Sequence, residues 1–562
     1  MSVPPADDDA PVAGVPVTAA SARTNLGRHT SLMASGTAAS RVLGFVRGAL
    51  LVYAISASGQ AANAFAVGNK LPNILYLLIA GGVLNAVLVP QVVRAYQRAD
   101  GDEYVNRLLT LGGVLLAALA AALTLGAPLL VAVYTDMKPE QTALAVLFAY
   151  WCLPQVFFYG LYTLVGQVLN AKGSFGPLMW APVVNNLVAM AGIGVFIAVN
   201  GLSRDNPALT HDPTSWTGAQ VALLAGTTTL GVIAQALVLL IPLRRSGFQY
   251  RPRWGVRGVG LGQAGRVASW TFVGLVVGQL GIIVVTRVAS AVAAAVEPGA
   301  AAAGPAIYDL AFLVFMLPHS LVTVSLLTAL FTGLSARAAA GDVPAVRADL
   351  SFGLRTVGLF TIIAAAVLMV LAVPFVRVLS PGLTTAEASA LATVIVVMLA
   401  GLPAFGAWSM AQRVFYAYAD ARSMVPIQVA MAAVVAGGAL AAQAVAEPRL
   451  WVAGAGLAMS VSYAIGAVVA LVVLRRRLRG VDASRVLRLY VRAGLAAAIA
   501  AAAGWAVVHA VGPSDGIVRS LVLCVGVGAG MTAAYGGLLT LMRVRELDDL
   551  VRPMLRRLHR SA

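Results

Sequence analysis

Three basic side chains lie deep inside apolar stretches of the sequence, where a charge is costly. Arg41 and Arg47 lie near the middle of the apolar run Ser31 to Ala57, and Lys70 lies well inside the next run, Ala61 to Gln91. Each such charge costs roughly 2.5 to 3.5 kcal/mol at the centre of a membrane helix, so it is seldom kept without a use. A guanidinium presents a planar fork of donors that fits phosphate. The three cations therefore predict a binding site for an anionic, phosphate-bearing substrate.

Residues around these cations indicate how the chain would present them. Arg41 and Arg47 are six residues apart, which turns them about 120° around a helix. Both reach one site only if their helix protrudes into a wide cavity. Gly44, between them, permits close approach of a neighbouring helix or a head group. Pro72 is expected to kink or break the next helix beside Lys70.

Asp309 is the clearest acidic residue within an apolar run, and it lies toward the outer end of the run Gly304 to Ser335. We expect it to form an ion pair or to take part in ion coupling. If the deep cations pair with Asp309 or with backbone carbonyls, their role is structural. Arg287, Arg377 and Arg413 lie close to predicted helix ends, where a long side chain reaches the membrane surface, and are interpreted as anchors.

The sequence carries no recognisable catalytic motif. Its three lysines lie outside any G-x-x-x-x-G-K-[ST] loop, and its five histidines form no H-E-x-x-H pair. The glycine-rich segments Gly258 to Gly265 and Gly526 to Gly530 lack a surrounding βαβ unit, which favours helix packing over nucleotide binding. Cys152 and Cys524 provide neither a disulfide framework nor a thiolate metal cluster. We therefore expect a protein that is not an enzyme and that uses no cofactor and no metal ion.

The composition indicates a protein that is embedded in a membrane. The chain has 562 residues, of which 60% are hydrophobic and 11% charged. Crossing about 30 Å of hydrocarbon takes roughly 20 apolar residues in a helix. Runs of this length predict about fourteen membrane-spanning helices. The expected fold class is an all-α polytopic membrane protein.

The net charge of +17 lies mainly in alternate loops. Arginines cluster after the second, sixth and twelfth predicted spans and in the tail from Arg543, whereas the loops 57–60, 135–141 and 296–305 hold few or no basic residues. Arginine-rich loops of membrane proteins face the cytoplasm, so we expect both termini there. This bias explains the charge without nucleic acid, which is not an expected partner.

Two halves of the sequence repeat a proline pattern. The matching positions are Leu71-Pro72 with Leu317-Pro318, Leu153-Pro154 with Leu402-Pro403, and Pro177 with Pro426. Each pair lies about six spans apart, which predicts a parallel repeat of two six-helix lobes with a site between them. Pro72 and Pro318 are candidate hinges.

These patterns divide the chain into five parts. Residues 1–30 are expected to be a disordered cytoplasmic tail, residues 31–245 the N-lobe and residues 262–475 the C-lobe. Residues 488–542 would add two further spans, and residues 543–562 a basic cytoplasmic tail.

Around the deep cations the sequence resembles the MurJ (MviN) lipid II flippase family of the multidrug/oligosaccharidyl-lipid/polysaccharide exporter superfamily. Residues 39–47, A-S-R-V-L-G-F-V-R, resemble the family's S-R-x-L-G-x-x-R. Residues 64–73 with Val89-Pro90 resemble its A-F…[KR]-[IL]-P-N…V-P segment. Residues 317–335 are similar to the matching repeat, and residues 415–426 to the family's F-Y-A…D…P.

The chain departs from this family pattern at several positions. Gly48 and Asn63 stand where many members carry Asp, Tyr76 stands for an Arg and Gly81 for a Glu. Leu313 lies near the place of an arginine that some members use.

The resemblance implies that the chain moves lipid II, an undecaprenyl-diphosphate-linked glycopeptide, from the cytoplasmic to the outer leaflet of a bacterial inner membrane. It implies alternating access of the two lobes, with a groove for the lipid tail at the two additional spans. The implied substrate contacts are Arg41, Arg47, Lys70, Asn63 and Asn73. Membrane lipids and the cell-wall synthesis machinery are the other expected partners.

Three alternatives remain open at this point. A flippase for another polyprenyl-linked glycan needs the same diphosphate contacts. A cation-coupled drug exporter of the same superfamily should carry deep Asp or Glu residues, whereas the deep residues here are basic. A scaffold of the cell-wall machinery would transport nothing.

Overall fold

The computed structural model describes residues 19–79, 101–254, 261–296, 302–380, 382–512, 516–544 and 546. These residues form helices and no strands, because in lipid an α-helix satisfies every backbone hydrogen bond within its own segment. Twelve helical segments of the described chain are long and apolar enough to cross a membrane, or thirteen if one bent pair counts as a single span. The second predicted span, 61–91, is described only up to Ile79. The predicted all-α polytopic fold is confirmed.

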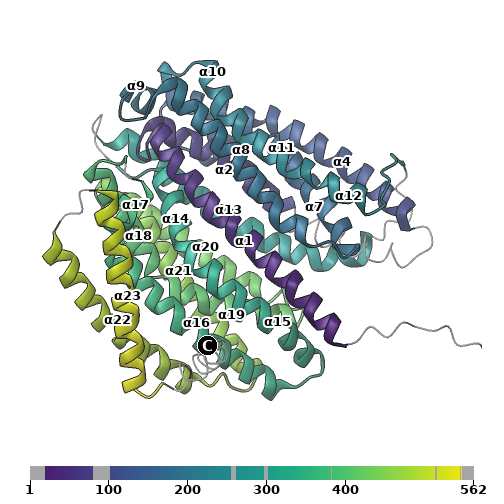
Figure 1. Cartoon of the computed structure of the whole chain (residues 1–562), viewed down its shortest axis with the longest axis vertical. Helices are drawn as coiled ribbons and strands as arrows, with labels where there is room; N and C mark the ends of the chain where they lie inside the picture. The colour runs from purple at the N-terminus through teal and green to yellow at the C-terminus, as the bar shows by residue number, and fades with distance from the viewer. Residues whose placement is uncertain are drawn as a thin grey trace, which may run out of the picture.

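The N-lobe is a bundle of helices in the first half of the chain (Figure 1). Its helices are α1 (Ala19–Ile55), α2 (Gln60–Ile79), α4 (Gly101–Leu125), α5 (Ala127–Tyr134), α6 (Pro139–Cys152), α7 (Gln155–Ala171), α8 (Gly176–Asn200), α9 (Pro207–His211), α10 (Gly218–Val221), the π-helical η3 (Ala222–Gly226), α11 (Thr227–Val238) and α12 (Leu240–Arg245). Helix α1 begins at Ala19, within the predicted disordered tail, because residues 19–30 contain no proline to stop it.

The C-lobe lies beside the N-lobe, and two further helices cover its outer side (Figure 1). Its helices are α13 (Leu261–Ala295), α14 (Pro305–Pro318), the π-helical η4 (His319–Thr323), α15 (Val324–Ala339), α16 (Val343–Val370), α17 (Ala372–Leu379), α18 (Thr385–Leu399), α19 (Leu402–Ala417), α20 (Met424–Val445) and α21 (Trp451–Arg477). The additional helices α22 (Ala483–Val511) and α23 (Ile517–Leu541) pack on α16 and α17.

Both lobes repeat one packing pattern. In the N-lobe α2 packs on α6, α4 on α7, and α8 on α1 and α11. In the C-lobe the corresponding helices pair in the same way: α14 packs on α18, α16 on α19, and α20 on α13 and α21. The matched spans also break at matched places, since α6 ends just before Leu153-Pro154 and α18 meets α19 at an angle of 44° just before Leu402-Pro403. The predicted parallel repeat is confirmed.

The two candidate proline hinges behave differently. Helix α2 runs through Pro72 without interruption, so the chain does not break there. A proline removes only the bond of its missing N–H to the carbonyl four residues earlier, here that of Gly68, and the rest of the helix holds. At Pro318 the geometry does change, because α14 ends and the wider turn η4 follows. Such π-turns often mark functional positions within a helix.

The loop between α19 and α20 contains Asp420, the Asp of the F-Y-A…D…P motif. Asp420 accepts hydrogen bonds from the Ser423 backbone N–H (3.1 Å) and from Ser423 Oγ (2.8 Å), and its carboxylate lies 2.5 Å from Arg477 Nη1. Burial alone would raise the pKa of Asp420, but Ser423 and Arg477 hold this pKa below its ordinary value. Asp420 therefore has a structural role in joining α19, α20 and α21.

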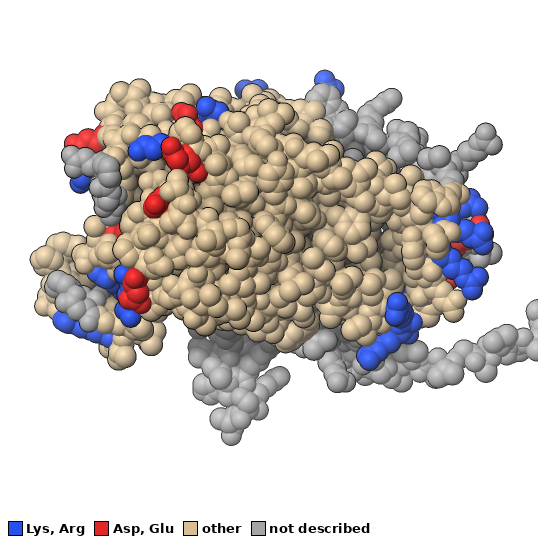
Figure 2. Space-filling view, turned by 90° about the horizontal axis from the view of Figure 1, so that it is seen from above, with Lys and Arg blue, Asp and Glu red and all other residues tan. Residues whose placement is uncertain are grey.

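The surface has the distribution of charge that a bilayer requires. Figure 2 shows charged side chains gathered toward the two ends of the molecule, with a broad uncharged band between them. Large apolar side chains such as Leu129 and Val518 are well exposed on the helices. Lipid tails cover such side chains as effectively as a protein core does.

Candidate site at the lobe boundary

Helix α1 lies along the boundary between the lobes (Figure 1). On one side Asn186 of α8 donates a hydrogen bond to the Ser40 carbonyl (2.9 Å), and a Cβ on Gly44 would lie 3.7 Å from Asn186 Nδ2. On the other side a Cβ on Gly48 would lie 3.8 Å from Leu313 of α14. A Cβ at Gly44 would therefore make only ordinary van der Waals contact with α8, and α1 carries its two arginines along the lobe boundary.

Arg41 and Arg47 are half-buried and point to different neighbours on this boundary. Arg41 interacts electrostatically with His319 in η4 of the C-lobe, and Arg47 with Tyr159 in α7 of the N-lobe. The Tyr159 ring lies 5.3 Å from that of Tyr76 on α2. Among the described residues, neither guanidinium has a carboxylate or hydrogen-bond partner. Both can therefore accept an anionic ligand without first breaking an ion pair.

Lys70 is engaged within the protein. Its Nζ lies 2.5 Å from Asp309 Oδ1 of α14 and 5.5 Å from the centre of the Tyr308 ring. Helix α2 belongs to the N-lobe and α14 to the C-lobe, so this ion pair joins the two lobes. Pairing with Asp309, which would make a deep cation structural, therefore occurs for Lys70 and not for the two arginines.

The two asparagines of the predicted site lie apart from each other. Asn63 is buried, and its Oδ1 accepts a hydrogen bond from the Ala306 backbone N–H (3.1 Å). A Cβ on Gly304 would lie only 2.5 Å from Asn63 Nδ2, so the lobes meet closely here. Asn73 is exposed on α2. Asn63 is therefore part of the contact between the lobes in this conformation.

Further polar contacts close the same end of the lobe boundary. Ser56 donates a hydrogen bond to Glu387 Oε1 of α18 (2.7 Å), and Ser58 donates to the same carboxylate oxygen. The Asp136 backbone N–H donates to Ser290 Oγ (2.7 Å). We call this set of contacts, with Asn63–Ala306 and Lys70–Asp309, the closed end. Most of its residues lie in or next to the arginine-poor loops.

The three arginines interpreted as anchors have partners within the described chain. Arg287 Nη1 donates to the Ala132 carbonyl (3.1 Å), which adds a contact at the closed end. Arg377 binds the loop that follows its own helix, through the Leu383 carbonyl (2.9 Å). The Arg413 guanidinium lies 5.3 Å from the centre of the Phe331 ring.

Sequence reasoning missed Glu387. Thr384 and Glu387 form a reciprocal capping box, a pattern that locally marks only the start of a helix. The serine partners of Glu387 lie about 330 positions away in the chain. No local signal links residues so distant, so this contact required the folded structure.

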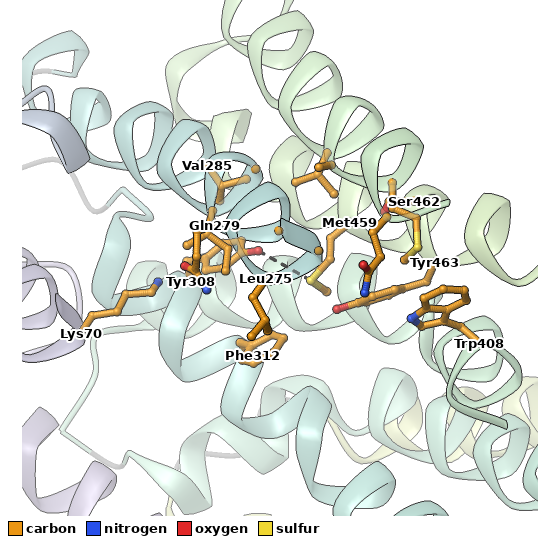
Figure 3. Close-up of a pocket in the computed structure, with 18 of the residues that line it drawn as sticks. Lys70, Leu275, Gln279, Val285, Tyr308, Phe312, Trp408, Met459, Ser462 and Tyr463 are labelled. Carbon is orange, nitrogen blue, oxygen red and sulfur yellow. Dashed lines mark hydrogen bonds between the residues drawn. The ribbon is translucent and has the colours of Figure 1, made fainter. Parts of the chain in front are cut away.

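A cavity of about 360 Å³ lies in the C-lobe beside the closed end. Lys70 reaches it from the N-lobe, and Tyr308, Trp408 and Tyr463 line it together with polar groups such as Gln279 (Figure 3). Gln279 is buried, and its Oε1 has no hydrogen-bond partner in the described part of the protein. Aromatic faces and an amide oxygen without a partner form an environment for a group that can donate a hydrogen bond. No cluster of three or more metal-ligating side chains occurs among the described residues.

The model of the family "Lipid II flippase MurJ" matches residues 53–525. A probable lipid II flippase MurJ of Haemophilus influenzae is 29% identical over 45% of this chain and 49% of its own length. A probable lipid II flippase MurJ of Synechocystis is 25% identical over 71% and 73%. The chain thus spans about half the length of the first of these relatives.

Solved structures share the fold. A lipid II flippase MurJ in an inward closed conformation superposes with a TM-score of 0.70 at 16% identity, covering 92% of this chain and 99% of that one. An inward-facing multidrug resistance MATE family transporter of the MOP superfamily superposes with a TM-score of 0.63 at 15% identity, over 78% and 94%. The family match covers most of the sequence, and the two-lobed fold with two additional helices agrees with it. The chain belongs to the lipid II flippase MurJ family.

Proposed function

We propose that this protein flips lipid II from the cytoplasmic to the outer leaflet of a bacterial inner membrane. The observation that carries the proposal is the pair of unengaged arginines, Arg41 and Arg47, on the boundary between two repeated lobes. Guanidinium groups bind phosphate oxygens in pairs, and a site of low dielectric strengthens each contact. The diphosphate of a polyprenyl-linked precursor fits such a pair. The names of the relatives supply the substrate.

Alternating access explains the contacts of the closed end. Its loops are poor in arginine, so the positive-inside rule puts the closed end at the outer surface. The conformation would then receive substrate from the cytoplasm. Outward opening requires the lobes to separate at Asn63, Lys70 and Glu387, which frees Lys70 from Asp309 and makes a third cation available to the diphosphate.

The two C-terminal helices offer a place for the lipid tail. An apolar groove of about 310 Å³ lies between α14, η4, α16 and α23, and Pro318, Phe360 and Val367 are among its lining residues. It reaches the π-turn η4 that holds His319, which interacts electrostatically with Arg41. A polyprenyl chain in this groove would leave the diphosphate close to the lobe boundary.

A reconstituted assay separates this proposal from its closest alternative. Proteoliposomes that contain the purified chain should translocate fluorescent lipid II faster than they translocate an undecaprenyl-diphosphate glycan without the pentapeptide. Equal rates for both would favour a general polyprenyl-glycan flippase. A drug exporter is less consistent with the site, since Arg41 and Arg47 at the lobe boundary are cations without a carboxylate partner among the described residues.

The proposed orientation is tested by labelling single cysteines. In a Cys524→Ser background, Thr214→Cys should react with a membrane-impermeant maleimide in intact cells, and Gln249→Cys only after permeabilisation. Both positions are exposed, and they follow α9 and α12 at opposite ends of the molecule. The Cys524→Ser chain is the control. Labelling of Gln249→Cys alone in intact cells would invert the topology.

The ion pair between Lys70 and Asp309 should hold the closed end together. Asp309→Asn removes an ion pair worth up to about 1 kcal/mol, so we expect the population with a separated closed end to rise by up to about fivefold. Spin labels at Thr214 and Glu447, one on each lobe, report this change as a longer distance. The exchanged pair Lys70→Asp with Asp309→Lys should restore the wild-type distribution. An unchanged distribution in Asp309→Asn would show that the pair does not control the lobes.

A further inference from the structure

A second basic site lies away from the lobe boundary, where the start of α22 meets α16 and the end of α23. This cavity has a volume of about 340 Å³. Its charged lining residues are Arg355, Arg485, Arg488, Arg492, Arg543 and Glu546. Five arginines against one carboxylate leave a net charge of +4 in the lining. We call these residues the arginine pocket.

Three separate parts of the chain build the arginine pocket. Arg485, Arg488 and Arg492 follow a spacing of three and four residues and so share one face of α22. Arg355 comes from α16. Arg543 follows α23 with a φ of 54°, a left-handed conformation that usually belongs to glycine. The positive-inside bias explains arginines in loops, but it does not explain their convergence from three helices on one cavity.

Much of this charge is not neutralised within the protein. Arg355 forms an ion pair with Glu546, and Arg492 Nη1 donates to the Met542 carbonyl (3.2 Å). Arg485 and Arg543 are exposed, and their side chains have no hydrogen-bond or ion-pair partner among the residues that the structure describes. Guanidinium donors that converge without acceptors favour a phosphate ligand.

The surroundings indicate where such a phosphate comes from. Leu487, Val491 and Leu495 are 65%, 52% and 54% exposed and repeat every four residues along α22, beside the arginines. This apolar stripe continues from the basic end of α22 toward the middle of the span, as acyl chains do below a lipid head group. We infer that the arginine pocket binds the phosphate of an anionic phospholipid, whose acyl chains lie on the stripe. This site is separate from the proposed transport path.

The inference is tested with the full chain in a nonionic detergent, titrated with phosphatidylglycerol and followed by native mass spectrometry. Arg485→Gln with Arg488→Gln should weaken phosphatidylglycerol binding by roughly 30-fold, since each arginine near a lipid surface contributes about a fivefold factor. The matched control is Arg475→Gln with Arg476→Gln, which removes equal charge from exposed positions at the end of α21. The control should change binding by less than about threefold, because neither residue lines the arginine pocket and salt screens their charge.

A variant that is expected to tighten binding separates a change in binding from misfolding. Glu546→Gln removes the carboxylate that competes for Arg355, so it should tighten phosphatidylglycerol binding, and unchanged or weaker binding would place the head group elsewhere. Phosphatidylcholine should bind more weakly than phosphatidylglycerol in the wild type. Equal loss in the two double variants would overturn the site. Displacement of phosphatidylglycerol by millimolar inorganic phosphate would identify a free-anion site instead. If undecaprenyl diphosphate binds and phosphatidylglycerol does not, the phospholipid assignment is overturned.

Discussion

Arg47→Ala is expected to reduce lipid II translocation at least tenfold while the protein still inserts into the membrane and folds. A hydrogen bond to a charged group contributes about 1.5 to 3 kcal/mol, so the lost contact weakens head-group binding roughly 10- to 150-fold. Arg47 has no carboxylate partner in the described structure, so its removal leaves no buried charge unpaired. Arg41→Ala should behave in the same way. Translocation in proteoliposomes, with thermal unfolding in parallel, measures both properties.

Two further variants sharpen this expectation. Arg47→Lys keeps the charge but loses the bidentate fork, so partial activity is expected. Arg519→Ala is the matched control, because Arg519 is exposed on α23 and donates to the Val511 carbonyl, far from the lobe boundary. A lower unfolding temperature in Arg47→Ala, with normal activity per folded molecule, would show that Arg47 is structural.

A disulfide across the closed end is expected to abolish transport completely. Asn63→Cys on α2 and Gly304→Cys just before α14 place two thiols where the Asn63 side chain already contacts the backbone of Gly304 and Ala306. The Gly304 backbone has a φ of −124°, which any residue adopts. If the lobes must separate here, the oxidised protein should be inactive, and reduction should restore its activity.

Each single-cysteine variant serves as a control for the disulfide, since it carries the same substitution without the bond. Oxidation should not lower the activity of either single variant; because the Cβ of a lone Gly304→Cys would lie 2.5 Å from Asn63 Nδ2, its activity is compared before and after oxidation. Full translocation by the oxidised double variant, with the crosslink verified by mass spectrometry, would rule out alternating access through this end.

The sequence revealed those parts of the site whose signal is local. Arg41 and Arg47 are visible because a charge within an apolar run is costly wherever the helix packs. The lobes were predictable because proline positions recur in the two halves, and the matched pair Pro154 and Pro403 coincides with real helix breaks. At Pro72 the helix continues without a break, since one missing hydrogen bond did not interrupt it.

Sequence patterns could not predict contacts between segments that are distant in the chain. Pairing with Asp309 was considered for all three deep cations, but only the packing of α2 against α14 assigns it to Lys70. The hydrogen bonds of Ser56 and Ser58 with Glu387 depend on the approach of two lobes. Gly81, one departure from the family pattern, lies outside the described residues.

Depletion of the protein in its own bacterium, followed by a leaflet-specific assay for lipid II, tests the central claim most directly. The account predicts that lipid II accumulates on the cytoplasmic face and that the wild-type chain restores its outward movement. A double variant, Arg41→Ala with Arg47→Ala, expressed at the normal level, should not restore it. An unchanged distribution of lipid II after depletion, or full rescue by the double variant, would contradict the account.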